Sequence, residues 1–268
     1  METLGYIGAV LMGLSLGLIG GGGSILTVPI LVYLFHVDAV LATAYSLFIV
    51  GLTSLIGSVS HMRLGNIHWR TAFVFGIPSI MAVYATRAWL VPALPDPLFH
   101  LGGAAVTKAL GMLILFAGLM VAAAYSMIRK PKAKAAAEPT GEAAFNYPLI
   151  LGEGIVVGTI TGLVGAGGGF LIIPALVLLA KLPMKQAVGT SLIIIALKSL
   201  IGFTGDLKGS EAMDWAFLGL FSAVAVAGIL IGSLLSKRIA NEKLKPAFGW
   251  FVLVMGMYII GRELAQLG

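Results

Sequence analysis

Long apolar runs, separated by short polar stretches, follow one another along almost the whole chain. A helix needs about 20 apolar residues to cross a bilayer, and most of the runs approach or reach that length. Two of them, 24–35 and 169–180, are shorter, which favours a re-entrant or tilted hairpin with the preceding segment over two full crossings. The pattern predicts an all-α bundle of ten membrane segments, at 4–20, 24–35, 39–60, 71–91, 105–128, 147–164, 169–180, 187–205, 215–235 and 246–262.

The two halves of the chain are repeats of each other. A shift of 145 residues superposes Gly17 on Gly162 and Pro29 on Pro174, and almost half of the positions in 17–57 match their partners. Five segments per half is an odd number, so the second half inserts with the opposite orientation, as in many secondary transporters. The predicted division is an N-terminal repeat at 1–128, a basic linker at 129–146 and a C-terminal repeat at 147–268.

Composition and charge agree with a multi-pass membrane protein. The chain is 59% hydrophobic and 10% charged, whereas soluble domains carry about 25% charged residues. Most of the 17 basic residues lie in the linker and in the loops after the third, seventh and ninth segments. Because basic loops stay in the cytoplasm, these loops are predicted to be cytoplasmic and both termini periplasmic. The net charge of +6 therefore reports topology and does not indicate a nucleic-acid partner.

Two glycine-rich turns interrupt the apolar pattern at equivalent places, reading GLIGGGGS from Gly17 and GLVGAGGG from Gly162. Irregular backbone at membrane depth requires surrounding protein or a water-filled cavity. The short helix after each turn starts with unpaired N–H groups and a partial positive charge, and the two starts converge in an inverted repeat. Close packing of helices through small residues is the alternative explanation. The predicted anion-binding backbone comprises Gly22, Gly23, Ser24, Gly167, Gly168 and Gly169.

Polar side chains of the third and eighth segments extend this predicted site. They form equivalent stripes on one helix face, which either line a pathway or bond neighbouring helices together. Among these side chains Lys198 gives the strongest indication of a functional site, because a charge within a membrane helix costs about 2.5–3.5 kcal/mol on insertion scales. It either snorkels to the interface or faces a cavity in which a substrate anion would pair with it. The predicted substrate-binding side chains are Ser46, Thr190, Ser191 and Lys198.

Four other ionisable residues complete the set of candidates. Glu153 lies near one end of the sixth segment, where it is solvated, pairs with Lys198 or carries a coupling proton. His61 and Asp206 occupy equivalent ends of the paired helices, where they are predicted to lie in loops, and gating of an entrance is the alternative role for either. Arg87 ends its segment and is interpreted as an interfacial anchor.

No catalytic or metal-binding pattern accompanies these features. The chain has no cysteine, and its four histidines are scattered without the spacing of metal ligands. Neither a nucleophile–base pair nor a phosphate-binding loop is present. We therefore expect no enzyme activity, no metal and no cofactor.

The paired glycine-rich turns, each followed by an apolar helix with an internal proline (Pro29 and Pro174), resemble the sulfite exporter TauE/SafE family of bacterial membrane permeases. The resemblance covers essentially the whole chain, including its duplication and basic central linker. The first turn departs slightly, with Ser24 where the second has Gly169. The resemblance implies a permease of the bacterial inner membrane, monomeric or homo-oligomeric, that transports sulfite, a sulfonate or another small organosulfur anion.

The membrane potential adds a direction to this expectation. An interior-negative potential favours anion exit by about 2.3 kcal/mol per charge per 100 mV, so export needs no coupling whereas uptake needs a coupled cation. The prediction is therefore a secondary transporter that exports sulfite or an organosulfonate by alternating access. The alternatives are an organosulfonate uptake permease, an anion channel and a membrane assembly factor without a transported solute.

Overall fold

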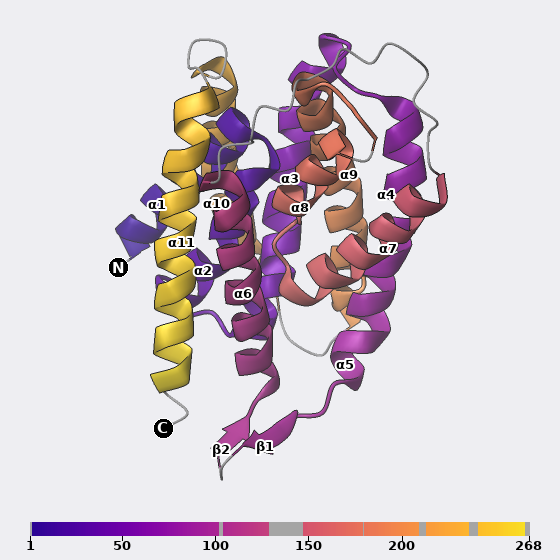
Figure 1. The fold of residues 1–268 in the computed structure, drawn as a ribbon. Coiled ribbons are helices and arrows are strands. Elements are labelled where there is room, and N and C mark those ends of the chain that lie inside the picture. The colour runs from indigo at the N-terminus through magenta and orange to yellow at the C-terminus, as the bar shows by residue number, and fades with distance from the viewer. Residues whose placement is uncertain are drawn as a thin grey trace.

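Helices account for almost all residues of the computed structural model, which describes residues 2–101, 104–128, 147–178, 180–208, 213–235 and 241–265 (Figure 1). The predicted linker at 129–146 lies outside these residues. The first half contains α1 (Glu2–Ile19), the 3-10 helix η1 (Gly21–Leu26), α2 (Thr27–Tyr33), α3 (Ala39–Arg63), α4 (Trp69–Ala85), the π-helical turn η2 (Thr86–Leu90), α5 (Val91–Ala93), β1 (Phe99–Leu101), β2 (Ala104–Val106) and α6 (Lys108–Ile128). The second half contains α7 (Tyr147–Val164), α8 (Gly169–Leu178), α9 (Met184–Thr204), the 3-10 turn η3 (Asp206–Lys208), α10 (Trp215–Leu235) and α11 (Asn241–Ala265).

Seven helices in the described part of the chain are long and apolar enough to cross a membrane. They are α3, α4 with its continuation to Ala93, α6, α7, α9, α10 and the apolar part of α11. Helix α8 has 10 residues and therefore a length of about 15 Å, half of the hydrocarbon thickness. The short antiparallel hairpin of β1 and β2 was not predicted from the sequence.

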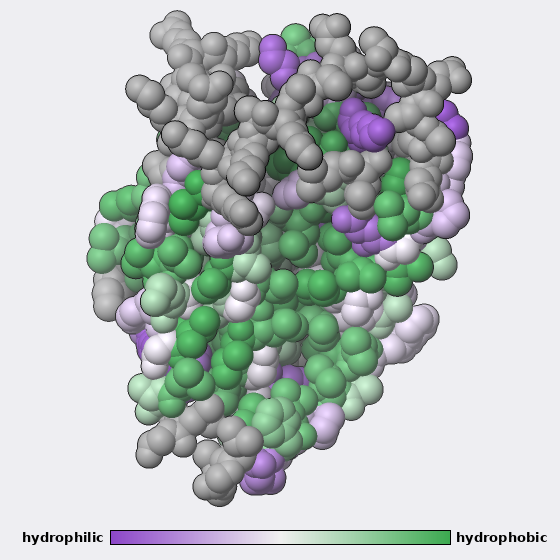
Figure 2. Space-filling model, viewed as in Figure 1, coloured by the Kyte–Doolittle hydropathy of each residue, from purple (hydrophilic) through white to green (hydrophobic). Residues whose placement is uncertain are grey.

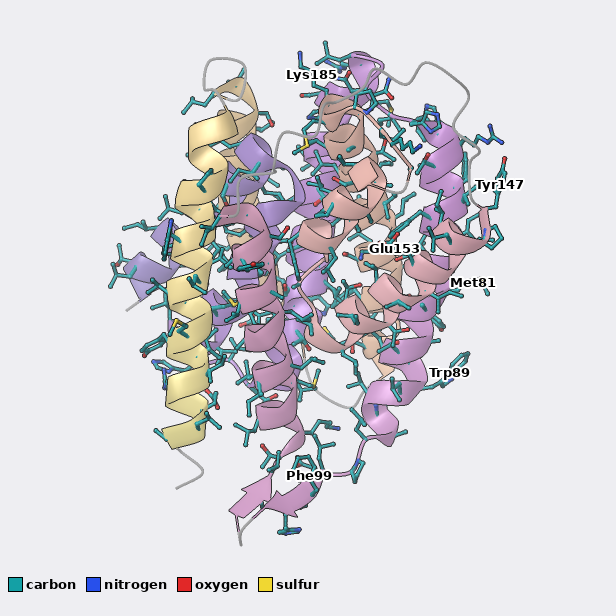
Figure 3. The ribbon with its side chains drawn as sticks, in the orientation of Figure 1. Met81, Trp89, Phe99, Tyr147, Glu153 and Lys185 are labelled. Carbon is teal, nitrogen blue, oxygen red and sulfur yellow. The ribbon has the colours of Figure 1, made fainter. Side chains whose placement is uncertain are left out.

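The two ends of the bundle are distinguished by labelled residues in Figure 3. Tyr147 and Lys185 lie at one end, which we call the linker end, and Phe99 lies at the other, which we call the β-hairpin end. Coloured hydrophilic residues gather mainly toward the two ends of the face in Figure 2, and hydrophobic residues dominate between them. This distribution suits a bundle whose middle lies in hydrocarbon.

The short helices α2 and α8 form hairpins with the helices that precede them. The ring of Tyr6, near the start of α1, packs at 5.2 Å from the ring of Phe35, just beyond the end of α2. The start and end of the first hairpin therefore lie together, and the second hairpin, of α7 and α8, starts and ends at the linker end (Figure 1).

Helices α3 and α9 form the centre of the bundle and pack against each other. In the most apolar stretch of α3, 67% of the residues are buried, and in that of α9 72%, compared with 28–39% in the other five spans. Around this pair, α1 packs on α10 as α7 packs on α4, and α6 packs on α11. Aliphatic and aromatic side chains fill the contacts, so polar atoms between α3 and α9 are shielded from water.

Candidate functional site

The glycine-rich tips of the two hairpins touch inside the bundle. A Cβ atom built on Gly21 would lie 2.1 Å from Cα of Gly169, and the reverse distance is also 2.1 Å. Side chains larger than hydrogen therefore do not fit at this contact. The predicted convergence of the two turns is present in the structure, and small-residue packing contributes to it as well.

The two tips differ in backbone conformation. In the second tip Gly167 and Gly168 have φ angles of +63° and +68°, a left-handed conformation that glycine adopts without strain, and α8 begins at Gly169 as predicted. In the first tip the predicted helix start at Ser24 is wrong, because a 3-10 helix already begins at Gly21. The N-terminal N–H groups of an α-helix are therefore offered by the second tip, at the start of α8.

Lys198 of α9 lies directly against the second tip. Its side chain is fully buried, and its Nζ donates a hydrogen bond of 2.9 Å to Oγ1 of Thr161. A Cβ atom on Gly168 would lie 2.8 Å from the same Nζ, so the ammonium group sits beside the start of α8. Two like charges, the ammonium and the helix N-terminus, thus meet in a buried place, which favours an anion there.

Lys198 has no acidic partner within the described part of the chain. An ion pair in this part of the chain joins Nε of Arg87 to Oδ2 of Asp206 at 2.8 Å and does not include Lys198. Glu153 precedes Thr161 by eight residues of α7, or about 12 Å along the helix, and is only partly buried (Figure 3). The structure therefore bonds Lys198 to Thr161 and not to Glu153.

Arg87 is a second buried cation, and its interpretation as an interfacial anchor is wrong. Its side chain is 1% exposed and lies in the π-helical turn η2, a local irregularity that often marks functional positions. Besides bonding Asp206, it donates from Nη1 to Oγ1 of Thr43 at 2.9 Å and to the carbonyl of Gly162 at 3.2 Å. Its Nη2 is buried without a hydrogen-bond partner.

The polar stripe of α3 faces the second tip. A Cβ atom on Gly167 would lie 2.5 Å from Cγ1 of Val50, and Ser46 and Ser54 lie one turn before and after Val50 on the same face. The hydroxyl groups of both serines are buried and have no hydrogen-bond partner, as has that of Ser199 on α9. These unpartnered hydroxyls are the groups that a polar solute would satisfy.

Other predicted polar side chains already have hydrogen-bond partners. The hydroxyl of Ser24 donates to the carbonyl of Gly21, and that of Ser191 donates to the carbonyl of Val188, both at 2.8 Å. Oγ1 of Thr190 accepts a hydrogen bond from the backbone N–H of His68. Ser24 and Ser191 thus retain acceptor capacity rather than a free proton.

The predicted gating residues lie near opposite ends of the bundle. His61 lies in the last turn of α3 beside Gly189 of α9, and its Nδ1 is buried without a partner. Asp206 follows α9 toward the β-hairpin end, where burial raises the pKa of its carboxyl and the neighbouring Arg87 lowers it, with a net rise. Both residues lie at helix ends, as predicted, but the predicted loop location is wrong for His61, which lies within α3, and each residue is partly buried.

A large apolar groove between α1, α2 and α11 is lined by neither Lys198 nor Arg87. Its volume is about 800 Å³, and its lining includes Leu11, Ile30, Phe251 and Met255. Arg262 also borders it, with its guanidinium 4.5 Å from the centre of the Tyr33 ring. Because the lining is almost wholly hydrocarbon, the groove does not suit a small anion, and we place the candidate site at Lys198.

Sequence reasoning missed Thr161, Thr43 and Arg87 as members of the site. Thr161 was hidden in an apolar helix, and Thr43 lay outside the recognised polar stripe. For Arg87 a usable signal was present, because the apolar run continues beyond the charge through the next six residues of the chain. The helical span accordingly extends to Ala93, so Arg87 lies inside it rather than at its end.

Comparisons with known proteins agree with this architecture. The family model of the sulfite exporter TauE/SafE matches residues 6–259. A probable membrane transporter protein of Xylella fastidiosa is 29% identical over 260 residues, covering 96% of this chain and 94% of the relative. The probable membrane transporter protein YunE of Bacillus subtilis is 27% identical over 282 residues, covering 99% of both.

Similarity over nearly the full length extends to a further organism. A probable membrane transporter protein of Methanocaldococcus jannaschii is 26% identical over 268 residues, covering 94% of each chain. No solved structure matches the chain. The family match spans nearly all of the helices described above, including both glycine-rich tips and the two buried cations. The chain therefore belongs to the sulfite exporter TauE/SafE family of membrane transporters.

Proposed function

We propose that the protein is a secondary carrier that exports small sulfur oxyanions or sulfonates across the bacterial inner membrane. The anion binds beside the second hairpin tip, between Lys198 and the N-terminus of α8. The unpartnered hydroxyls of Ser46 and Ser54 lie on the α3 face that turns toward this tip and would donate hydrogen bonds to the anion's oxygens. The family and the names of the relatives support transport over an assembly role.

The observation that carries the proposal is the isolated charge of Lys198. An ammonium group that is fully buried and bonded to a neutral hydroxyl is unfavourable unless an anion joins it. The start of α8 adds backbone N–H groups and a partial positive charge at the same place. Together they suit an anion with several oxygens, which accepts from more than one donor.

Inverted repeats provide a route for alternating access. In the repeat, each helix of the first half has an equivalent in the second, so that α1 corresponds to α7 and α4 to α10. The contact of α1 with α10 is therefore equivalent to that of α7 with α4, and the contacts of α3 with α9 and of α6 with α11 each join two equivalent helices. This correspondence supports a pseudo-two-fold axis in the membrane plane through the central pair. Rocking of one set of helices against the other would expose the tips to each side in turn.

Charge supports an orientation in which the linker end faces the cytoplasm. Arg63, Arg70, Lys181 and Lys185 lie in or beside the loops at this end. Positively charged loops stay inside, so the β-hairpin end would face the periplasm. The interior-negative potential then drives anions from the linker end to the β-hairpin end.

The proposal is tested by sulfite efflux from liposomes that contain the purified protein, at a set membrane potential. Native protein is expected to give saturable efflux that increases as the interior becomes more negative. Lys198→Met is expected to abolish it, whereas Lys185→Met, at the exposed start of α9, serves as the matched control. Linear flux without saturation would indicate a channel, and native flux in Lys198→Met would remove Lys198 from the site.

A further inference from the structure

Arg87 has an incomplete set of partners for a buried guanidinium group. Such a group has five N–H donors: one on Nε and two on each terminal nitrogen. Asp206 takes the donor on Nε, and Thr43 and Gly162 take those on Nη1. Both donors on Nη2 are left, although the side chain is fully buried. A buried donor without a partner is unfavourable, so the two Nη2 donors are the part of Arg87 that is able to bind a further acceptor.

Asp206 bonds one of the two nitrogens, Nε and Nη2, on the edge of the Arg87 guanidinium that it faces. Nε and Nη2 lie side by side on that edge, and a carboxylate in the strongest geometry bonds both at once. Here Oδ2 bonds Nε at 2.8 Å and Nη2 has no partner, so the pair is joined through one bond. An anion with two oxygens on one atom would engage the whole edge where Asp206 engages part of it.

Arg87 and Lys198 are anchored on consecutive residues of α7. Nζ of Lys198 donates to Thr161, and Nη1 of Arg87 donates to the carbonyl of Gly162. The two cations thus share the last turn of one helix, immediately before the second glycine-rich tip. Asp206 is the one acidic side chain bonded to either of them within the described residues, so this pair of cations keeps a net positive charge.

We propose that Arg87 is a second anion-binding group on the path from Lys198 to the β-hairpin end, specific for oxyanions, and that Asp206 is the internal carboxylate which a passing oxyanion displaces. The proposal rests on the proposed carrier function. Asp206 has a side chain that is 13% exposed and follows the end of α9, so it is able to move toward the bundle end when it is displaced. Sulfite, sulfonates and carboxylates have the paired oxygens that fit the Nε–Nη2 edge, and halides do not.

The test measures equilibrium binding of sulfite and methanesulfonate to the purified full-length protein, with chloride as the competitor that lacks paired oxygens. Asp206→Asn is expected to tighten oxyanion binding severalfold, because the neutral amide competes less for Arg87. Arg87→Lys keeps the charge but loses the two-pronged edge, and is expected to weaken binding by about tenfold. In the double variant, the gain from Asp206→Asn is expected to disappear.

Each result separates this proposal from the carrier function. Weaker or unchanged oxyanion binding in folded Asp206→Asn would overturn the displacement of Asp206. The same conclusion would follow if, on the native protein, chloride competed with sulfite as strongly as methanesulfonate competes with it. If Lys198→Met loses binding while both other variants bind like the native protein, the carrier site stands and the role of Arg87 fails. No oxyanion binding by the native protein would overturn both. If Arg87→Lys does not fold, the proposal is tested by oxyanion binding to the near-isosteric Asp206→Asn and by chloride competition on the native protein.

Discussion

Adding one methyl group where the hairpin tips touch tests the central contact of the fold. In Gly169→Ala the new Cβ atom would lie 2.1 Å from Cα of Gly21 and 2.6 Å from its carbonyl oxygen. Ordinary contact begins near 3.4 Å, so one tip has to move by about 1.3 Å. Both clashing atoms belong to the backbone, so rotation of a side chain does not relieve the overlap.

The expected effect follows from the cost of overpacking. Forcing an extra carbon atom into a tightly packed contact costs about 1–3 kcal/mol, which exceeds the gain of about 0.5–1 kcal/mol from replacing a helical glycine by alanine. Gly169→Ala is therefore expected to melt several degrees below the native protein and to lose most of its anion flux, because Lys198 and the start of α8 are displaced from the first tip.

The assay combines thermal melting of the purified protein with efflux from liposomes, and the chain supplies a matched control. Gly152 lies in α7, also in a membrane helix, but a Cβ atom there meets nothing within 4 Å. Gly152→Ala is expected to melt at or slightly above the native temperature and to keep native flux. A native melting temperature together with native flux in Gly169→Ala would refute the contact between the tips.

Three other predictions concern the charges and hydroxyls of the site. Lys198→Met is expected to raise the melting temperature of the anion-free protein while it removes flux, because a buried cation without an anion is destabilising; thermal melting measures this. Burial raises the pKa of Asp206 more than Arg87 lowers it, so affinity for methanesulfonate, whose charge is constant, is expected to rise as the pH falls through that raised pKa. The protonated carboxyl no longer competes for Arg87, and Asp206→Asn is expected to flatten the profile. Finally, Ser46→Ala is expected to weaken anion binding and Ser191→Ala to leave it unchanged in a binding titration, because the hydroxyl of Ser191 already donates to its own helix.

The helices and the two glycine-rich interruptions could be predicted from the sequence, because each depends on a local run of apolar residues or glycines. Apolar length predicted ten membrane segments, and seven helices in the described part of the chain are long and apolar enough to cross a membrane. The short segments at 24–35 and 169–180 correspond to η1 with α2 and to α8. Helix boundaries at the first tip were not accessible. The second tip needs left-handed glycines at Gly167 and Gly168, whereas the first continues as a 3-10 helix, and both conformations are open to a run of glycines.

The membership of the site depended on tertiary contacts that a linear pattern does not contain. Lys198 was recognisable because a charge inside a long apolar run is rare. Its partner Thr161 looked like any small residue of α7, since threonine hydroxyls in helices usually bond to the preceding turn, as Thr161 also does with the carbonyl of Gly158. Arg87 lay close to the predicted end of its segment, and although the apolar run beyond it indicated a longer helix, its partner Asp206 comes from 119 residues further along the chain.

The charges of the site do not follow the repeat, and this has a consequence for direction. The sequence offset between the halves places Thr53 opposite Lys198, Leu16 opposite Thr161 and His61 opposite Asp206. The helix contacts follow the repeat, whereas the two fully buried cations of the described residues, Lys198 and Arg87, lie beside the second tip. A symmetric scaffold makes the two access states similar in packing, so the difference between them has to come from side chains at the two ends. In the proposed carrier an oxyanion would meet Arg87 and its carboxylate partner Asp206 toward the β-hairpin end, whereas the position equivalent to Asp206 at the linker end holds His61. We infer that, in the proposed carrier, the exit step is controlled by anion exchange at Arg87, a control that the duplicated scaffold by itself does not provide.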